Sequence, residues 1–240
     1  AGNCAFSLLN NELAIKKYEQ SLKAPGINAD TEREVLYFKG LAEHNLWDGK
    51  KSSGAAKTLN AYQKKYPEAK YINNSYYICA VESFPESNSR KAVEYTEMYL
   101  KTAPNENIKQ KAVLMLASVY TDYKMYDKAV SVLEPYTSKK NDFASECMLR
   151  TAEIYSKAGS TEKAAETYYR IYETKSFSAN AEAALFKSGE VMYADSQYEK
   201  ASQYFEKYSS VYPQGNYSEA AMYYEFDSFV QTGNTTKAVL

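Results

Sequence analysis

Seven alanines recur along the chain at a nearly constant spacing, and this repeat restricts the possible folds more than any other feature. In YDKAVSVLEPY, TEKAAETYYRIY and YEKASQYFEKY the alanine follows two charged residues and precedes an apolar or aromatic residue by four positions. The anchors are Ala14, Ala55, Ala92, Ala129, Ala164, Ala201 and Ala238. Their separations of 41, 37, 37, 35, 37 and 37 residues indicate an internal structural repeat.

Each repeat has the same internal pattern around its anchor. Twelve residues before the anchor most units have a small residue, namely Gly2, Ala80, Ala117, Ala152 and Gly189. Spacings of three and four between the apolar residues predict two amphipathic helices per unit rather than strands. Polar breaks such as KAGST (157–161) predict the turn between them. Proline twelve residues after the anchor predicts the end of the second helix, and Pro135 predicts an early end or a kink in the fourth unit.

This pattern of two antiparallel helices, a small residue in the first and an alanine in the second resembles the tetratricopeptide repeat, whose period is 34 residues. The resemblance covers essentially the whole chain. It is weakest over residues 31–59, where Gly40 serves as the small residue and the connector 45–54 holds three extra residues. It implies an all-α fold, a right-handed superhelical α-solenoid of helix-turn-helix repeats.

Two segments resemble a particular variant of that family. YPEAKYINNSYY (66–77) and YPQGNYSEAAMYY (212–224) are similar to the repeats of bacterial envelope proteins of the YbgF and BamD type. This resemblance favours the periplasm or cell envelope over the cytoplasm. We expect residues 1–240 to form a single array of about six and a half units of about 37 residues. Both ends are expected to cut a unit, as in an excerpt of a longer repeat protein.

Composition and motifs exclude several classes of function. Lys and Arg number 29 against 30 Asp and Glu, so the basic excess of a nucleic-acid-binding protein is missing. No apolar run is long enough to span a membrane. The three cysteines form no close pair that could hold zinc, and His44 is the only histidine. Without nucleotide-binding, zinc-protease or hydrolase motifs, we expect a protein that is not an enzyme and needs no cofactor or metal.

The 25 tyrosines are the most unusual feature of the composition, and most of them fall at predicted helix-packing positions. In the resembled family the first helix of each unit lines a concave face that binds peptides. Residues 15, 11 and 8 before each anchor should point to that face. The predicted partner-binding groove contains Tyr37, His44, Tyr77, Phe84, Glu153, Phe186, Glu190, Tyr193, Tyr223 and Asp227. Aromatic side chains with scattered acids suit an apolar peptide that carries some basic residues.

The predicted function is a non-catalytic scaffold that docks a peptide or a partner protein on this face. Family members that clamp a chaperone's C-terminal carboxylate use Lys and Asn at the inner positions, which are absent here, so that partner is not expected. One alternative is a cell-envelope module that binds glycans. The aromatic residues for it are Tyr77, Phe84, Phe186, Tyr193 and Tyr223. Another alternative is a structural spacer whose groove stays empty.

Overall fold

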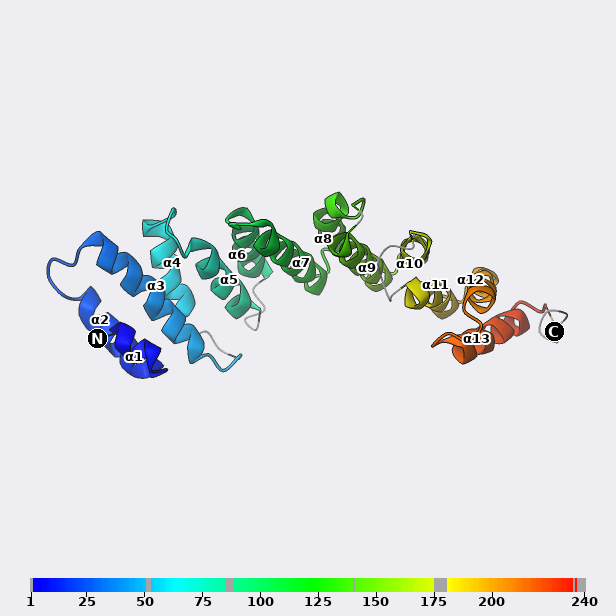
Figure 1. Cartoon of the computed structure of the whole chain (residues 1–240), viewed down its shortest axis with the longest axis horizontal. Coiled ribbons are helices and arrows are strands. Elements are labelled where there is room, and N and C mark those ends of the chain that lie inside the picture. Colours follow the sequence, from blue (N-terminus) through cyan, green and yellow to red (C-terminus); the bar gives the residue numbers. More distant parts are fainter. Residues whose placement is uncertain are drawn as a thin grey trace. The chain divides into compact units, whose positions relative to one another are not determined.

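The computed structural model describes residues 2–50, 53–84, 89–139, 141–174, 181–234 and 236. Within these ranges the chain forms thirteen α-helices and one short 3-10 helix, with no strand, as Figure 1 shows. The helices fall into two compact units, Ala1–Val119 and Tyr120–Leu240. The predicted all-α class is therefore confirmed.

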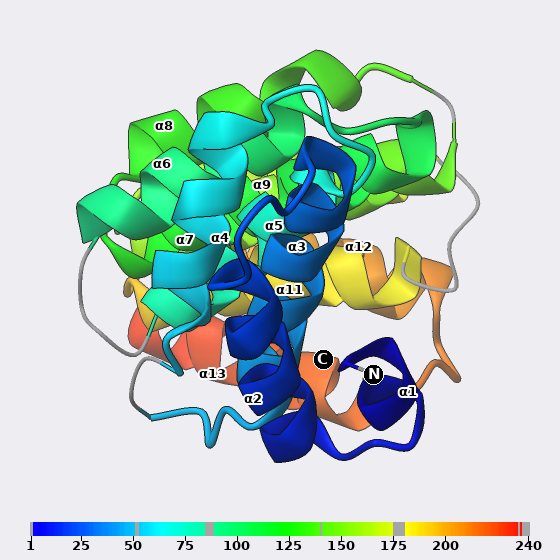
Figure 2. The ribbon, with the colours of Figure 1, turned by 90° about the vertical axis from the view of Figure 1, so that its left-hand side faces the viewer.

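The first unit contains helices α1 to α6 and the greater part of α7. From α1 to α6, each helix packs on the next one along the chain. Their bounds are α1 Gly2–Ser7, α2 Asn11–Leu22, α3 Ala29–Asn45, α4 Ala55–Lys65, α5 Ile72–Ser83, α6 Ser89–Lys101 and α7 Glu106–Asp122. Helix α3 packs against both α2 and α4, and Figure 2 shows α2 and α3 on the side that faces the viewer.

In the second unit each helix again packs on the next one along the chain. The bounds are α8 Tyr126–Leu133, η1 Glu134–Tyr136, α9 Asp142–Lys157, α10 Thr161–Glu173, α11 Ala181–Ala194, α12 Tyr198–Val211 and α13 Ser218–Gln231. Helix α8 stops directly before η1, which contains Pro135. The predicted early end is confirmed, because proline lacks the amide that would continue the helix.

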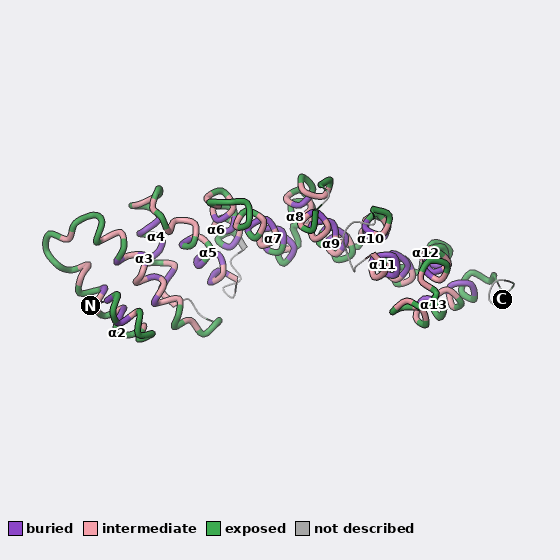
Figure 3. The backbone as a smooth tube through the Cα atoms, in the orientation of Figure 1, coloured by how far each residue is buried: buried purple, intermediate pink, exposed green. Residues whose placement is uncertain are grey.

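The anchor alanines lie where the helices cross. All six anchors within the described residues are fully buried, namely Ala14, Ala55, Ala92, Ala129, Ala164 and Ala201. The seventh, Ala238, lies outside the described residues. Along the helices of both units, buried positions alternate with exposed ones, as the purple and green stretches of the tube in Figure 3 show. Small side chains at these points let the helix backbones approach closely.

The small residue of the first helix packs against the large residue four positions after the anchor. A Cβ atom added to Gly40 would lie 2.5 Å from Leu59, and one added to Gly189 would lie 2.7 Å from the ring of Phe205. Gly2 faces the ring of Tyr18 in the same way. These contacts confirm the predicted register, including the assignment of Gly40 to the second repeat, the one anchored at Ala55.

The turn between the two helices of a unit also repeats. The fifth residue before the anchor has a positive φ in five units: Leu9, Lys124, Gly159, Ser196 and Gly233. This left-handed conformation ends the first helix and is easiest for glycine. Three of the five positions nevertheless carry a side chain.

Candidate functional site

A cavity of about 640 Å³ lies within the first unit, between α5 and α7, and Tyr99 of α6 also lines it. One face of α5 and one face of α7 line it, since the contributing residues on each helix are spaced by three or four positions. The lining residues are Lys70, Tyr71, Asn73, Asn74, Tyr77, Val81, Tyr99, Pro104, Ile108, Lys111 and Met115. A cavity of this size is in the range of pockets that enclose a ligand, about 300 to 1,000 Å³.

The lining combines an apolar interior with positive charge. Tyr77, Val81 and Met115 supply the apolar surface, and no Asp or Glu is among the lining residues. Lys70 and Lys111 are both exposed. The Lys70 ammonium lies 5.1 Å from the centre of the Tyr71 ring, an interaction that keeps this flexible side chain beside the cavity. The cavity therefore suits an apolar group that carries negative charge nearby.

The amides of α5 hold the surrounding helices in place. The Asn73 side-chain amide donates to the backbone carbonyl of Tyr99, at 2.7 Å, and to Thr102 Oγ1, at 3.1 Å. The Asn74 side-chain amide donates to the Tyr37 hydroxyl, at 2.7 Å. These bonds connect α5 to α6 on one side and to α3 on the other.

Of the predicted groove residues, Tyr77 lines this cavity and is 40% exposed. Its ring centre lies 5.3 Å from that of Tyr99. Phe84 directly follows α5 and is half-buried, but it is not part of the cavity lining. Sequence reasoning did not select Lys70, Ile108 or Lys111. Extending the predicted face of each first helix by one further turn toward its start would have included Lys111, whereas Lys70 lies two residues before α5 begins.

Two predicted groove residues are covered by tyrosines of the same chain. Tyr37 is only 4% exposed because Tyr71 stacks on its ring, with centres 4.3 Å apart and planes 14° apart. Phe186 is 5% exposed because Tyr217 stacks on it, at 4.7 Å and 13°. These two rings belong to the core, so neither offers its face to a partner in this conformation.

The two covering tyrosines, Tyr71 and Tyr217, each make an equivalent backbone hydrogen bond to another tyrosine. The backbone amide of Tyr71 donates to the Tyr62 hydroxyl, at 3.3 Å, and that of Tyr217 donates to the Tyr208 hydroxyl, at 2.9 Å. Tyr62 and Tyr208 each lie seven residues after an anchor. The Tyr208 hydroxyl also donates to Glu182, at 2.6 Å. That bond is the largest reason why the pKa of Glu182 is lowered.

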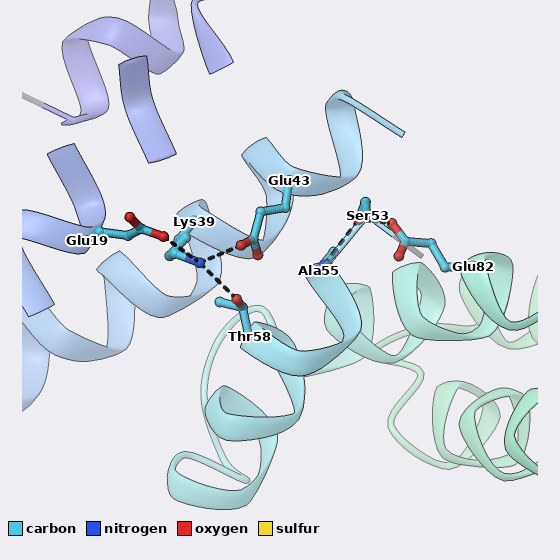
Figure 4. Close-up of polar contacts among 7 residues, drawn as sticks. All are labelled: Glu19, Lys39, Glu43, Ser53, Ala55, Thr58 and Glu82. Atoms are coloured by element: carbon cyan, nitrogen blue, oxygen red, sulfur yellow. Dashed lines mark hydrogen bonds and ion pairs between the residues drawn. The ribbon is translucent and has the colours of Figure 1, made fainter. Parts of the chain in front are cut away.

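His44 lies at a polar contact between α3 and α5. Its Nδ1 atom is 2.9 Å from Oε1 of Glu82, whose side chain is 2% exposed. Ser53 donates to the same Glu82 oxygen, at 2.7 Å, and accepts from the amide of Ala55 at the start of α4, as Figure 4 shows. This arrangement joins three helices around one buried carboxylate, and we assign it a role in packing.

A second polar contact lies close by in Figure 4. The Lys39 ammonium pairs with Glu43 on the same helix and reaches Glu19 of α2, at 3.7 Å. It also donates to the Thr58 hydroxyl of α4, at 3.2 Å. Lys39 thus links α2, α3 and α4. Within the described residues, no group of three or more His, Cys, Asp or Glu side chains could hold a metal ion.

In the second unit the structure brings together Tyr193 of α11 and Asp227 of α13. The Tyr193 hydroxyl donates to Asp227 Oδ2, at 2.5 Å, and this bond to a carboxylate raises the pKa of Tyr193 to about 12. Glu190 pairs with Lys187, at 2.6 Å, and Glu153 pairs with Arg150, at 3.3 Å. These acids are therefore already partly neutralised by neighbours on their own helices.

Helix α13 presents an exposed apolar surface. Tyr223 is 62% exposed, and so is the neighbouring Met222. Phe226 and Val230 follow at a helical spacing and are 51% and 47% exposed. Tyr223 is thus accessible, as a groove residue must be, whereas Tyr193 is half-buried against Tyr224.

The repeated helix pairs, the buried anchors and the glycine contacts define a helical repeat protein of the tetratricopeptide class. The family model described as "Tetratricopeptide repeat-like domain" matches residues 28–183, and the model described as "Tetratricopeptide repeat" matches residues 183–215. The chain belongs to the tetratricopeptide repeat-like family. A search of the curated proteins finds no match to it.

Solved structures show the same fold at low sequence identity. The apo form of RapI matches with a TM-score of 0.55 and 15% identity, covering 98% of this chain and 71% of RapI. A signal transduction ATPase with a tetratricopeptide repeat sensor, PH0952 from Pyrococcus horikoshii, matches with a TM-score of 0.50 and 15% identity. That match covers 97% of this chain and 38% of the ATPase. Within the described residues, no helix is long and apolar enough to cross a membrane.

Proposed function

We propose that this protein is a non-catalytic interaction scaffold that docks a peptide or a partner protein. The observation that carries the proposal is the cavity between α5 and α7, which is aromatic and apolar inside and carries polar groups at its edge. Such a site anchors one or two side chains of a partner, and buried anchors of this kind supply most of the binding energy in protein interfaces.

The first helices of the second unit support the same function. Tyr223, Tyr193 and Asp227 form a mixed aromatic and acidic surface on α11 and α13. A carboxylate that already accepts a tyrosine hydroxyl keeps lone pairs for a further donor. We propose that this surface takes apolar segments with basic residues, as the sequence predicts for the groove.

The experiment is a selection from a library of peptides displayed on phage, using the purified full chain as bait. The scaffold function predicts enriched peptides whose binding falls when Tyr77→Ala removes the largest exposed ring of the cavity. A loss of about 10-fold or more is expected for an anchor contact. Tyr136→Ala, in η1 of the second unit, is the matched control and should leave binding unchanged. A library that yields no binder would contradict the proposal.

Glycan binding is the second candidate, and the exposed ring of Tyr223 is the observation that favours it. The candidate is weakened at Phe186, whose face is taken by Tyr217. Binding to a polysaccharide array that disappears in Tyr193→Ala and Tyr223→Ala would support it. A protein that binds neither peptides nor glycans would act as a spacer.

We also infer that the chain is of the envelope type. The inference is supported by the two Tyr-Pro turns, which place Tyr71 and Tyr217 in the same way. Fractionation of cells that produce the protein naturally tests the compartment, since this inference predicts recovery with the periplasm or envelope. Recovery with the cytoplasm would contradict it.

A further inference from the structure

The cavity lies at a position that, in two other repeats, is filled by the ring of a tyrosine from the same chain. Tyr71 and Tyr217 each lie sixteen residues after an anchor and cover a ring in the first helix of the same unit. In the third repeat, anchored at Ala92, the residue sixteen positions after the anchor is Ile108. The first-helix ring in that repeat is Tyr77, which lines the cavity together with Ile108.

The missing ring accounts for the exposure of Tyr77. The two rings that are covered by a tyrosine, Tyr37 and Phe186, are 4% and 5% exposed, whereas Tyr77 is 40% exposed. The partner of the backbone amide also differs. The amides of Tyr71 and Tyr217 donate to a tyrosine hydroxyl, whereas the amide of Ile108 donates to Asn105 Oδ1, at 3.0 Å. An isoleucine has no flat face to stack on Tyr77, and its smaller side chain leaves space beside that ring.

The charges around this space identify the partner further. Within the described residues, no ion pair joins Lys70 or Lys111 to a carboxylate, and both side chains are exposed. The chain as a whole has a formal charge of −1, so the positive charge here is local rather than a property of the whole protein. Two lysines that have no carboxylate partner among the described residues, beside an apolar cavity, attract carboxylates and repel basic segments.

We propose that the cavity binds an aromatic side chain from an acidic segment of a partner protein. The partner's ring stacks on Tyr77 as Tyr71 stacks on Tyr37, and neighbouring Asp or Glu side chains pair with Lys70 and Lys111. This proposal rests on the scaffold function and specifies the partner for one of its sites. The preference for acidic segments at this cavity differs from the preference for basic segments proposed for the surface on α11 and α13.

The test uses an array of nine-residue peptides with amidated C-termini, so that only side chains supply carboxylates. The central residue is Phe, Tyr, Leu or Ala, and its neighbours are acidic, neutral or basic. The full chain should retain peptides with an aromatic centre and acidic neighbours about 10-fold better than the other classes. Raising the salt concentration should reduce this preference.

Three variants separate the two parts of the proposal. Ile108→Tyr gives the third repeat the ring that the second and sixth repeats have in Tyr71 and Tyr217. It should therefore fill the cavity and abolish binding of the aromatic peptides. The double substitution Lys70→Glu and Lys111→Glu should reverse the charge preference toward basic peptides. Lys57→Glu with Lys64→Glu is the matched control, because it makes the same change in net charge on α4, away from the cavity.

The outcomes distinguish this proposal from the scaffold function. Equal retention of acidic and basic peptides, or unchanged binding by Ile108→Tyr, would overturn it. If the array shows no binding but the phage library yields partners, the acidic aromatic ligand is wrong and the scaffold stands. Far-ultraviolet circular dichroism checks that each variant is folded. The lysine substitutions lie on exposed side chains, so they test the charge requirement even if Ile108→Tyr fails to fold.

Discussion

The contact between Gly189 and Phe205 allows a sharp test of the packing. A Cβ atom on Gly189 would lie 2.7, 2.8 and 2.9 Å from three atoms of the Phe205 ring, whereas carbon atoms normally approach to about 3.5–4.0 Å. Phe205 is fully buried and stacks on Tyr224, with ring centres 5.5 Å apart. The ring is therefore enclosed and cannot move aside freely.

Two effects of opposite sign act in Gly189→Ala. Replacing glycine by alanine inside a helix ordinarily stabilises by about 0.8–1.0 kcal/mol. Crowding a well-packed core costs about 1–3 kcal/mol. We expect the crowding to dominate, so that the free energy of unfolding falls by about 1 kcal/mol. The corresponding change at Gly40 should cost less, because it meets the movable end of the Leu59 side chain.

The assay is urea unfolding followed by circular dichroism, in wild type, Gly189→Ala, Phe205→Leu and the double variant. In the Phe205→Leu background the crowding is relieved, so Gly189→Ala should become neutral or stabilising there. The resulting coupling between the two sites is about 1 to 2 kcal/mol. Equal m values among the four proteins ensure that the midpoints report stability. A stabilisation of about 1 kcal/mol in both backgrounds would refute the close packing.

Three further outcomes follow from the structure. Burial raises the pKa of Tyr168 and Tyr208 to about 12, so the unfolded chain loses these protons first as the pH rises. Each tyrosine should therefore lower stability by up to about 1.4 kcal/mol per pH unit between about pH 10 and 12, measured by unfolding alongside absorbance at 295 nm. Alkylation at pH 8 should modify the exposed Cys4 first, because burial raises the pKa of Cys79 and Cys147 to about 12; equal rates would contradict this. Ser196→Gly should raise the melting temperature by relieving a positive φ, with about 1 kcal/mol gained, and a lower one would contradict the turn conformation.

The sequence by itself determined the repeat, the helical class and the register. Anchors and small residues could be found because each unit packs mainly against its neighbours, so the same local pattern recurs along the chain. The buried anchors and the contacts of Gly40 and Gly189 confirm that register. The family resemblance together with helix periodicity selected the side of the first helices that carries Tyr77 and Tyr223, both of which are accessible.

Only the tertiary structure decided which of the groove aromatics are accessible. Tyr37, Phe186 and Tyr77 occupy equivalent positions in their first helices, and nothing in their own surroundings along the chain separates them. Their exposure depends on whether a tyrosine or Ile108 follows at the start of the next unit, more than thirty residues away. Burial of an aromatic face belongs to the pair of rings that stack, so a pattern within one helix cannot reveal it.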